Sequence, residues 1–196
     1  MNITQKPSPN FTVDPTFKPI GFIIHGTLGN YEGAINWLCT PAAARVPVSY
    51  SSAHYVIAKD GRCTQLVSEK NIAWHAGVVN NPTAYAASVL PKVLGTYKNP
   101  NSSFIGIELE WFVGDVVTEA QIAAVCQIIA NSGIKNPIVL SHKEITDYKG
   151  DFTTKEGKID MTAILEIRKR ITPAAPAPVV DKMAIKTQII NLINLL

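Results

Sequence analysis

The stretch GFIIH at residues 21–25 is an apolar run that ends in a histidine. A second run, PIVLSH at residues 137–142, ends in the same way. Short apolar runs of this kind are typical of buried β-strands. A residue at the end of a buried strand emerges at the rim of a sheet, where clefts form in α/β proteins. We therefore expect His25 and His142 to meet at one rim, although 117 positions (142 − 25) separate them.

The remaining segments combine strand and helix patterns, which is typical of an α/β fold. Strands are predicted over residues 52–57, 62–67 and 104–111, the first two joined by a hairpin turn. Helices are predicted over residues 31–39, 118–132 and 161–171. Residues 1–19 are expected to form an arm over the domain, and residues 78–103 are expected to form a loop.

The composition changes after residue 172, which divides the chain into three parts. Residues 1–172 form the globular domain, and PAAPAP at residues 173–178 predicts a stiff linker. Residues 179–196 predict an amphipathic helix with a wide apolar stripe that includes Ile185, Ile189, Leu192 and Leu196. A stripe of this width favours a homo-oligomer formed through the C-terminal helix, with docking onto the globular domain as the alternative.

Length and composition exclude several classes of protein. The chain has 196 residues, 46% of them hydrophobic and 17% charged, with a net charge of +3. That apolar content excludes a disordered chain, and the charge is too small to indicate nucleic acid as a partner. No apolar run reaches the roughly 18 residues of a transmembrane segment. The first residues lack the apolar core of a signal peptide, so we expect synthesis in the cytoplasm.

The two strand-end histidines suggest a metal centre. A catalytic zinc site takes three protein ligands and keeps one position open for water. The third ligand is expected to be His, Asp, Glu or Cys. Asp160 opens the last predicted helix and closely follows Lys158, which makes it the candidate. The sequence therefore predicts a Zn²⁺ site formed by His25, His142 and Asp160.

Six segments together resemble the zinc-dependent N-acetylmuramoyl-L-alanine amidases, a superfamily that includes amidase-type phage endolysins and peptidoglycan recognition proteins. In family order they are IIHGT (23–27), SAHYVIAKDG (52–61), AWHAG (73–77), IGIELE (105–110), SH (141–142) and KID (158–160). Each segment alone is a weak signal, but six in order are specific. The resemblance covers residues 20 to about 170 and implies a mixed central β-sheet flanked by helices.

The resemblance implies a role for each matching residue. His25, His142 and Asp160 match the zinc ligands of the His/His/Asp type. Residues that match catalytic positions of the family are Glu108, which activates water, Tyr55 near the metal, and Lys158, which faces the developing oxyanion. Trp74 and His75 match the element that lines the substrate groove.

The sequence departs from the family around the third ligand. Members usually continue the Lys-x-Asp element with Pro-Gly, whereas Met161 and Thr162 follow here. The distance from His142 to Asp160 is 18 positions (160 − 142), longer than in relatives, which an inserted surface loop would explain. Asp151 and Asp147 remain alternative third ligands.

The expected reaction is hydrolysis of the amide bond between N-acetylmuramic acid and L-alanine in peptidoglycan. The absence of a signal peptide together with the tail favours a phage endolysin, which reaches the host wall after release from the cytoplasm. A cytosolic amidase that recycles free muropeptides is one alternative. A peptidoglycan-binding module without catalysis is the other, and a complete set of ligands argues against it.

Overall fold

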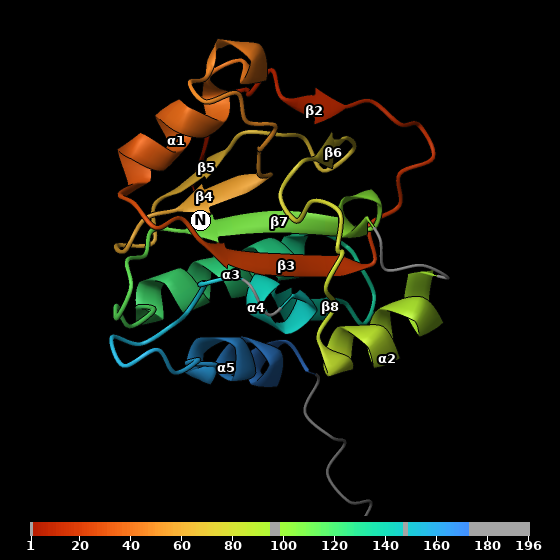
Figure 1. Ribbon diagram of the computed structural model, residues 1–196, viewed down its shortest axis with the longest axis vertical. Helices are drawn as coiled ribbons and strands as arrows, with labels where there is room; N and C mark the ends of the chain where they lie inside the picture. The colour runs from red at the N-terminus through yellow and green to blue at the C-terminus, as the bar shows by residue number, and fades with distance from the viewer. Residues whose placement is uncertain (1, 95–98, 147–148, 173–196) are drawn as a thin grey trace, which may run out of the picture.

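A six-stranded β-sheet forms the centre of the computed structural model, which describes residues 2–94, 99–146 and 149–172 (Figure 1). Its strand order is β1-β5-β4-β7-β3-β8. In that order the bounds are Ile3–Gln5, Cys63–Gln65, Tyr55–Ile57, Phe104–Leu109, Gly21–Gly26 and Ile138–Ser141. Strands β4, β7, β3 and β8 run parallel, and β5 pairs antiparallel with β4. The sheet is therefore mixed, as the resemblance implied.

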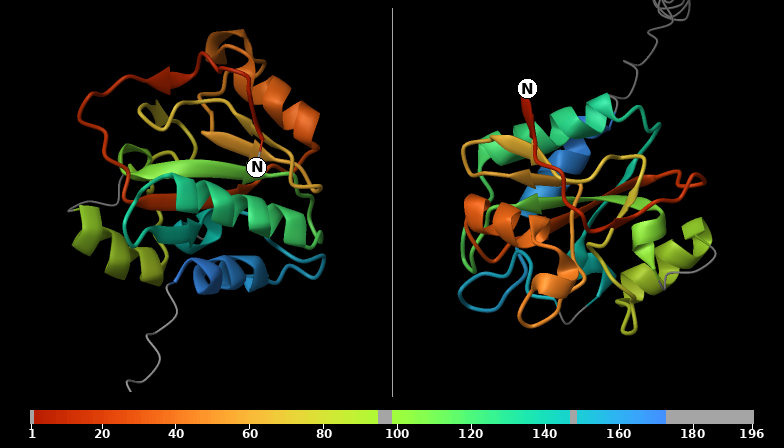
Figure 2. Two further views of the ribbon diagram at one scale, coloured as in Figure 1. Left: turned by 180° about the vertical axis from the view of Figure 1, so that it is seen from behind. Right: turned by 90° about the horizontal axis from the view of Figure 1, so that it is seen from above.

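Helices cover both faces of this sheet. On one face α3 (Glu119–Asn131) and α5 (Thr162–Ile171) pack against apolar side chains of the central strands (Figure 2). On the other face α1 (Tyr31–Cys39) packs against Val56 and Leu66. The remaining elements are α2 (Ala84–Leu94), α4 (His142–Ile145), the 3-10 turns η1 (Ala42–Ala44) and η2 (Pro100–Ser102), and a small sheet of β2 (Phe11–Thr12) and β6 (Ile72–Ala73).

Alternation along the central strands decides which side chains face α1. In β3, Phe22 and Ile24 belong to the core beneath α3, so the intervening Ile23 and His25 point to the opposite face. Strands β3 and β7 pair in register, with His25 opposite Glu108. His25 and Glu108 therefore lie side by side on the α1 face of the sheet.

Most predicted elements are confirmed. Strands occur within residues 52–57, 62–67, 104–111 and 137–142, and β3 extends one residue beyond the predicted 21–25. Helices occur within 31–39, 118–132 and 161–171. Thr118 and Gln121 form the expected capping box at the start of α3.

Two predictions about the first half of the chain are wrong. The stretch 78–103, expected to be a loop, contains α2, which begins where the Thr83 hydroxyl accepts a hydrogen bond from the Ala86 amide. Pro91 lies inside this helix. Because proline is unfavourable in a helix interior, its presence in the sequence argued against a helix here. The N-terminal arm is also part of a sheet, because β1 pairs parallel with β5. A three-residue edge strand is too short to show the alternation of apolar and polar residues by which strands are predicted.

The linker 173–178 and the amphipathic segment 179–196 lie outside the described residues. Among the residues that are described, no helix is long and apolar enough to cross a membrane.

Candidate active site

His25, His142 and Asp151 bring their ligand atoms together at the end of the central strands. All three side chains are buried, and these atoms lie within 4.8 Å of one another. The two Nδ1 atoms of His25 and His142 are 2.9 Å apart, and Nδ1 of His142 is 3.3 Å from Oδ2 of Asp151. The sequence prediction that the two strand-end histidines meet is therefore confirmed.

Strand register explains why the histidines meet. Parallel strands β3 and β8 pair Ile24 with Ser141, so the next residue of each, His25 and His142, lies at the same rim of the sheet. Ser141 then caps α4 through a reciprocal pair of hydrogen bonds with Glu144, which turns the chain just after the strand. The loop after α4 returns Asp151 to the same point.

The donor set fits a zinc ion. Nε2 of His142 and Oδ2 of Asp151 are buried without a hydrogen-bond partner, which is costly for polar atoms. Two imidazoles and a carboxylate are ligands that catalytic zinc takes, with the fourth position left for water. A cation held by His25, His142 and Asp151 would satisfy the carboxylate oxygen of Asp151.

His75 orients His25 for this role. Nε2 of His75 lies 3.1 Å from the carbonyl oxygen of Phe104, so this nitrogen is the one that donates. Nδ1 of His75 must then accept from Nε2 of His25, 3.0 Å away. These two hydrogen bonds leave Nδ1 of His25 unprotonated and directed at His142. An unprotonated nitrogen is what metal binding requires. Burial, followed by the neighbouring His142, lowers the pKa of His25 well below its usual value, which keeps the ring neutral.

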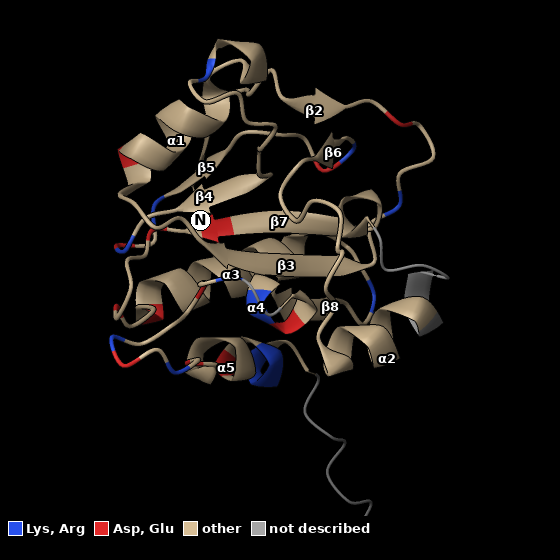
Figure 3. Ribbon diagram, viewed as in Figure 1, with Lys and Arg blue, Asp and Glu red and all other residues tan. Residues whose placement is uncertain are grey.

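Glu108 adds a carboxyl group close to the three ligand atoms, because it lies opposite His25 in the sheet and faces the same cavity. Acidic residues colour the carboxyl end of β7 in Figure 3. Burial and the nearby carboxylate of Asp151 raise the pKa of Glu108 to about 8, while Lys149 opposes that rise. A carboxyl group with a pKa in this range can both take up and release a proton near neutral pH.

These groups form part of the wall of a cavity of about 540 Å³. Its polar end is lined by His25, His75, Glu108, His142, Lys149 and Asp151. The opposite wall is α1, through Gly33, Ala34 and Trp37. The size and the mixture of apolar walls with converging polar groups are typical of a small-molecule site.

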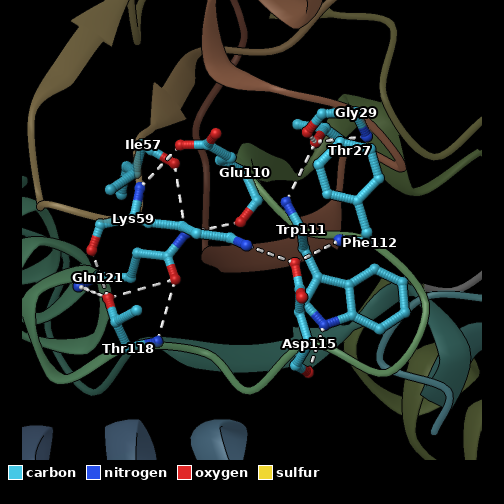
Figure 4. Close-up of polar contacts among 10 residues, drawn as sticks. All are labelled: Thr27, Gly29, Ile57, Lys59, Glu110, Trp111, Phe112, Asp115, Thr118 and Gln121. Atoms are coloured by element: carbon cyan, nitrogen blue, oxygen red, sulfur yellow. Dashed lines mark hydrogen bonds and ion pairs between the residues drawn. The ribbon is translucent and has the colours of Figure 1, made fainter. Parts of the chain in front are cut away.

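Phe112 lies at the rim of this cavity and is held there by a turn (Figure 4). Oδ2 of Asp115 accepts from the Phe112 amide at 3.0 Å and pairs with Nζ of Lys59 at 2.6 Å. The indole of Trp111 donates to the Asp115 carbonyl at 2.8 Å, and the Trp111 amide donates to Thr27 on the other side. The turn 111–115 is thus fixed to the strand end that carries His25.

Gly106 makes room for His75. A Cβ atom at position 106 would come within 2.3 Å of the His75 ring. We expect Gly106→Ala to displace this ring and to lower metal affinity or activity by roughly 10–100-fold, the usual effect of losing a partner of a metal ligand. Because the clash is with His75, the double variant Gly106→Ala, His75→Ala should be no worse than His75→Ala alone. Zinc competition with a chelating dye measures this, and additive losses would contradict the explanation.

Asp160, the predicted third ligand, lies away from the two histidines. Its Oδ1 accepts a hydrogen bond of 2.9 Å from the Thr162 amide at the start of α5. It borders a different cavity, beside Trp111 and Phe152. The turn that pairs Thr153 with Ile159 brings the Asp160 amide back to the carbonyl oxygen of Phe152 at 2.7 Å, but the Asp160 carboxylate is used at the start of α5 and not in the cluster. The structure brings in Asp151, one of the two alternatives, and Asp147 lies outside the described residues.

Lys158 and Tyr55 also lie outside the cavity lining. Lys158 is exposed on the same turn as Asp160. Tyr55 belongs to the core beneath α3, where its hydroxyl donates to Glu69 at 2.8 Å. Alternation in β4 places Tyr55 on the face opposite His25, so the expectation that it lies near a metal at His25 is wrong.

The two predicted groove residues are separated by the structure. His75 lines the cavity as expected. The indole of Trp74 instead donates to Thr12 at 2.9 Å, toward the N-terminal arm, and Trp74 is not among the cavity-lining residues. Sequence reasoning missed Lys149. Its signal was present, because Lys149-Gly150-Asp151 has the same Lys-x-Asp spacing as Lys158-Ile159-Asp160.

Comparison with known proteins identifies the family. The sequence profile of the N-acetylmuramoyl-L-alanine amidase family matches residues 15–157, a range that includes Asp151 and ends before Asp160. N-acetylmuramoyl-L-alanine amidase A of Achromobacter lyticus is 46% identical over 55 residues, which is 28% of this chain and 28% of that relative. The alignment thus covers well under half of the relative.

Solved structures share the fold at low sequence identity. A crystal structure of AmpD is 22% identical with a TM-score of 0.59, over 84% of this chain and 93% of that one. The amidase LysC of Clostridium intestinale is 16% identical with a TM-score of 0.53, over 87% and 97%. With the profile match over most of the chain, these findings place the protein: it belongs to the N-acetylmuramoyl-L-alanine amidase family.

Proposed function

We propose that the protein is a zinc-dependent amidase that hydrolyses the bond between N-acetylmuramic acid and L-alanine in peptidoglycan. One observation carries this proposal. In a chain of this family, His25, His142 and Asp151 converge at the polar end of a cavity that also contains Glu108. The alternative of a binding module without catalysis is disfavoured by this complete set of groups.

His25, His142 and Asp151 would hold the metal. A zinc ion bound there would polarise the amide carbonyl and lower the pKa of a bound water toward ~7. His75 contributes by fixing the tautomer of His25 through the hydrogen bond between the two rings.

Glu108 is the residue proposed to move the proton. Its carboxylate would accept a proton from the attacking water and would later donate it to the amine of the departing L-alanine. Its position opposite His25 in the sheet places it next to the cluster. Tyr55, on the far face, has no part in this step.

Lys149 takes the role that the sequence analysis gave to Lys158. It lines the cavity, and it lies close enough to lower the pKa of both His25 and Glu108. An ammonium group in this place would stabilise negative charge that develops on the carbonyl oxygen during attack.

A pair of lysine variants tests that assignment. We expect Lys149→Met to lower kcat by roughly 10²-fold, the size of the effect when one oxyanion-stabilising group is removed. The matched variant Lys158→Met should leave kcat within about twofold, because exposed surface substitutions change little. Steady-state kinetics on a purified muropeptide measure both. The reverse order of effects would return the role to Lys158.

Metal content and hydrolysis test the proposed function itself. We expect about one zinc per chain and the release of new L-alanine amino termini from peptidoglycan, lost with a chelator and restored by zinc. Zinc binding without cleavage of either peptidoglycan or free muropeptides would favour the binding module. Release of amino groups other than that of L-alanine would indicate a peptidase instead.

Within this activity we propose the role of a phage endolysin, with a recycling amidase as the second candidate. The linker 173–178 and the apolar segment 179–196 support it, since hydrolysis of free muropeptides needs neither. An endolysin should lyse permeabilised bacterial cells and prefer polymeric peptidoglycan. A preference for free muropeptides by kcat/KM would favour recycling.

We also propose that residues 179–196 join copies of the chain. Their apolar residues, spaced four, three and four apart, suit a helix–helix contact. Light scattering on the full chain should give a mass above that of one copy. The double variant Ile189→Asp, Leu192→Asp should reduce it to the monomer mass. A wild-type monomer would contradict the oligomer and favour docking on the globular domain.

A further inference from the structure

Helix α1 gives the cavity a wall that extends beyond the metal-binding cluster. The lining residues Asn30, Gly33, Ala34 and Trp37 follow the spacing of one helix face. From Asn30 to Trp37 this face extends about 10 Å along the axis. The small side chains in its middle leave space, and the large indole of Trp37 lies at its far end.

Trp37 is a large aromatic side chain that is partly exposed. Its relative exposure is 41%, although it borders a cavity and belongs to helix α1. One face of its ring is covered by the guanidinium of Arg45, whose central carbon lies 5.1 Å from the ring centroid. The arrangement is a cation–π contact, which holds a planar ring in a fixed orientation.

Arg45 is itself fixed by a network of hydrogen bonds. It is only 2% exposed, and it donates to the carbonyl oxygens of Leu38, Thr40, Ser49 and Ser51 and to the Ser51 hydroxyl. Burying a charged side chain is costly unless its donors are satisfied, and these donors are satisfied by the chain on both sides of it. The Trp37 ring therefore rests on a rigid, prebuilt support.

A half-exposed indole on a rigid support favours binding to a flat apolar surface. Aromatic rings bury large area with little loss of conformational freedom, which makes them effective contacts in binding sites. In peptidoglycan, the stem peptide offers mainly small or charged side chains. The flat apolar surface in this substrate is the C–H face of a pyranose ring.

We propose that Trp37, supported by Arg45, is a subsite for the glycan part of the substrate, where a pyranose ring stacks on the indole. This inference rests on the proposed function, because it takes peptidoglycan as the substrate. It assigns the α1 wall to the sugar, so sugar-bearing substrates should bind more tightly than substrates that carry the lactyl-peptide alone.

Two substrates separate a sugar contact from a general effect. One is the disaccharide N-acetylglucosaminyl-N-acetylmuramic acid carrying L-Ala-D-Glu, and the other is lactoyl-L-Ala-D-Glu, which has no sugar ring. We expect Trp37→Ala to raise KM for the first about tenfold, which corresponds to the loss of one aromatic stacking contact, and to leave kcat nearly unchanged. For the lactoyl peptide, kcat/KM should be unchanged. Trp37→Phe should recover part of the loss.

Tyr85→Ala serves as the matched control. Tyr85 is 45% exposed, similar to Trp37, but it borders a different cavity next to α3. It should leave KM for both substrates unchanged. Equal losses on both substrates in Trp37→Ala would overturn the proposal, as would no loss on either. Thermal unfolding of each variant identifies a loss of activity that is due to misfolding. If Trp37→Ala is misfolded, the KM values of Trp37→Phe for the two substrates are compared with those of the wild type instead.

A binding measurement keeps this test separate from the proposed function. Calorimetry with the free disaccharide requires no hydrolysis, and it should show weaker binding to Trp37→Ala than to the wild type. If the wild type cleaves neither substrate but still shows this difference, the amidase proposal fails and the subsite stands. If wild type and variant bind the disaccharide equally, or if neither binds it, the subsite is wrong whatever the activity.

Discussion

Asp151→Ala is expected to remove zinc and abolish most hydrolysis. The side chain contributes one of the three ligand atoms of the buried cluster. Its Oδ2 has no hydrogen-bond partner that would offset the cost of its burial without a metal. Loss of a mere partner of a metal ligand already costs roughly 10–100-fold, so loss of the ligand should lower kcat/KM by at least about 100-fold. Zinc per chain, measured on the purified variant, should fall in parallel.

Asp160→Ala is the matched control for this prediction. Asp160 ends a Lys-x-Asp element of the same spacing, but its carboxylate accepts from the Thr162 amide at the start of α5. Removing this single hydrogen bond should lower the free energy of unfolding by about 0.5–1.5 kcal/mol. Zinc content and kcat should stay near those of the wild type. A loss of zinc in Asp160→Ala, with zinc retained in Asp151→Ala, would reverse the assignment of the third ligand.

The histidine pair could be predicted from sequence because strand ends are simple to locate. Apolar runs that end in histidine mark β3 and β8, and parallel pairing places His25 and His142 at one rim. The third ligand lies in a loop, where side chains follow no regular alternation that would predict which of them faces the histidines. Two Lys-x-Asp elements occur after His142, at 149–151 and 158–160, and spacing within the element cannot distinguish them. The family profile does distinguish them, because its match ends at residue 157, after Asp151 and before Asp160.

Tyr55 shows a different limit of matching residues to a family pattern. The alternation of a strand fixes which neighbours share a face, but a matching residue type does not say which face is used. In β4 the cavity face carries Val56, which packs under α1, while Tyr55 lies with the core under α3. Trp37 is the reverse case, because it lines the cavity but no motif in the sequence marks it as a site residue. It reads as an ordinary apolar residue of a short helix, and only the buried Arg45 distinguishes it.

Glu108→Gln is expected to lower kcat by roughly 10²–10⁴-fold, the usual contribution of a general acid–base group. Glutamine keeps the size and shape of the side chain but cannot take up a proton. KM should change little, because substrate contacts are preserved. Zinc content should also stay near one per chain, because Glu108 is not among the three ligands.

Glu110→Gln provides the matched control two residues along the chain. Its carboxylate accepts from the Lys59 amide at 2.9 Å, outside the cavity, so only a surface contact is altered. Its kcat should remain within about twofold of the wild type, as for most surface substitutions. Equal activity of Glu108→Gln and the wild type would show that the proton passes through another group, and Glu108 would then be a structural carboxyl group of the cavity wall.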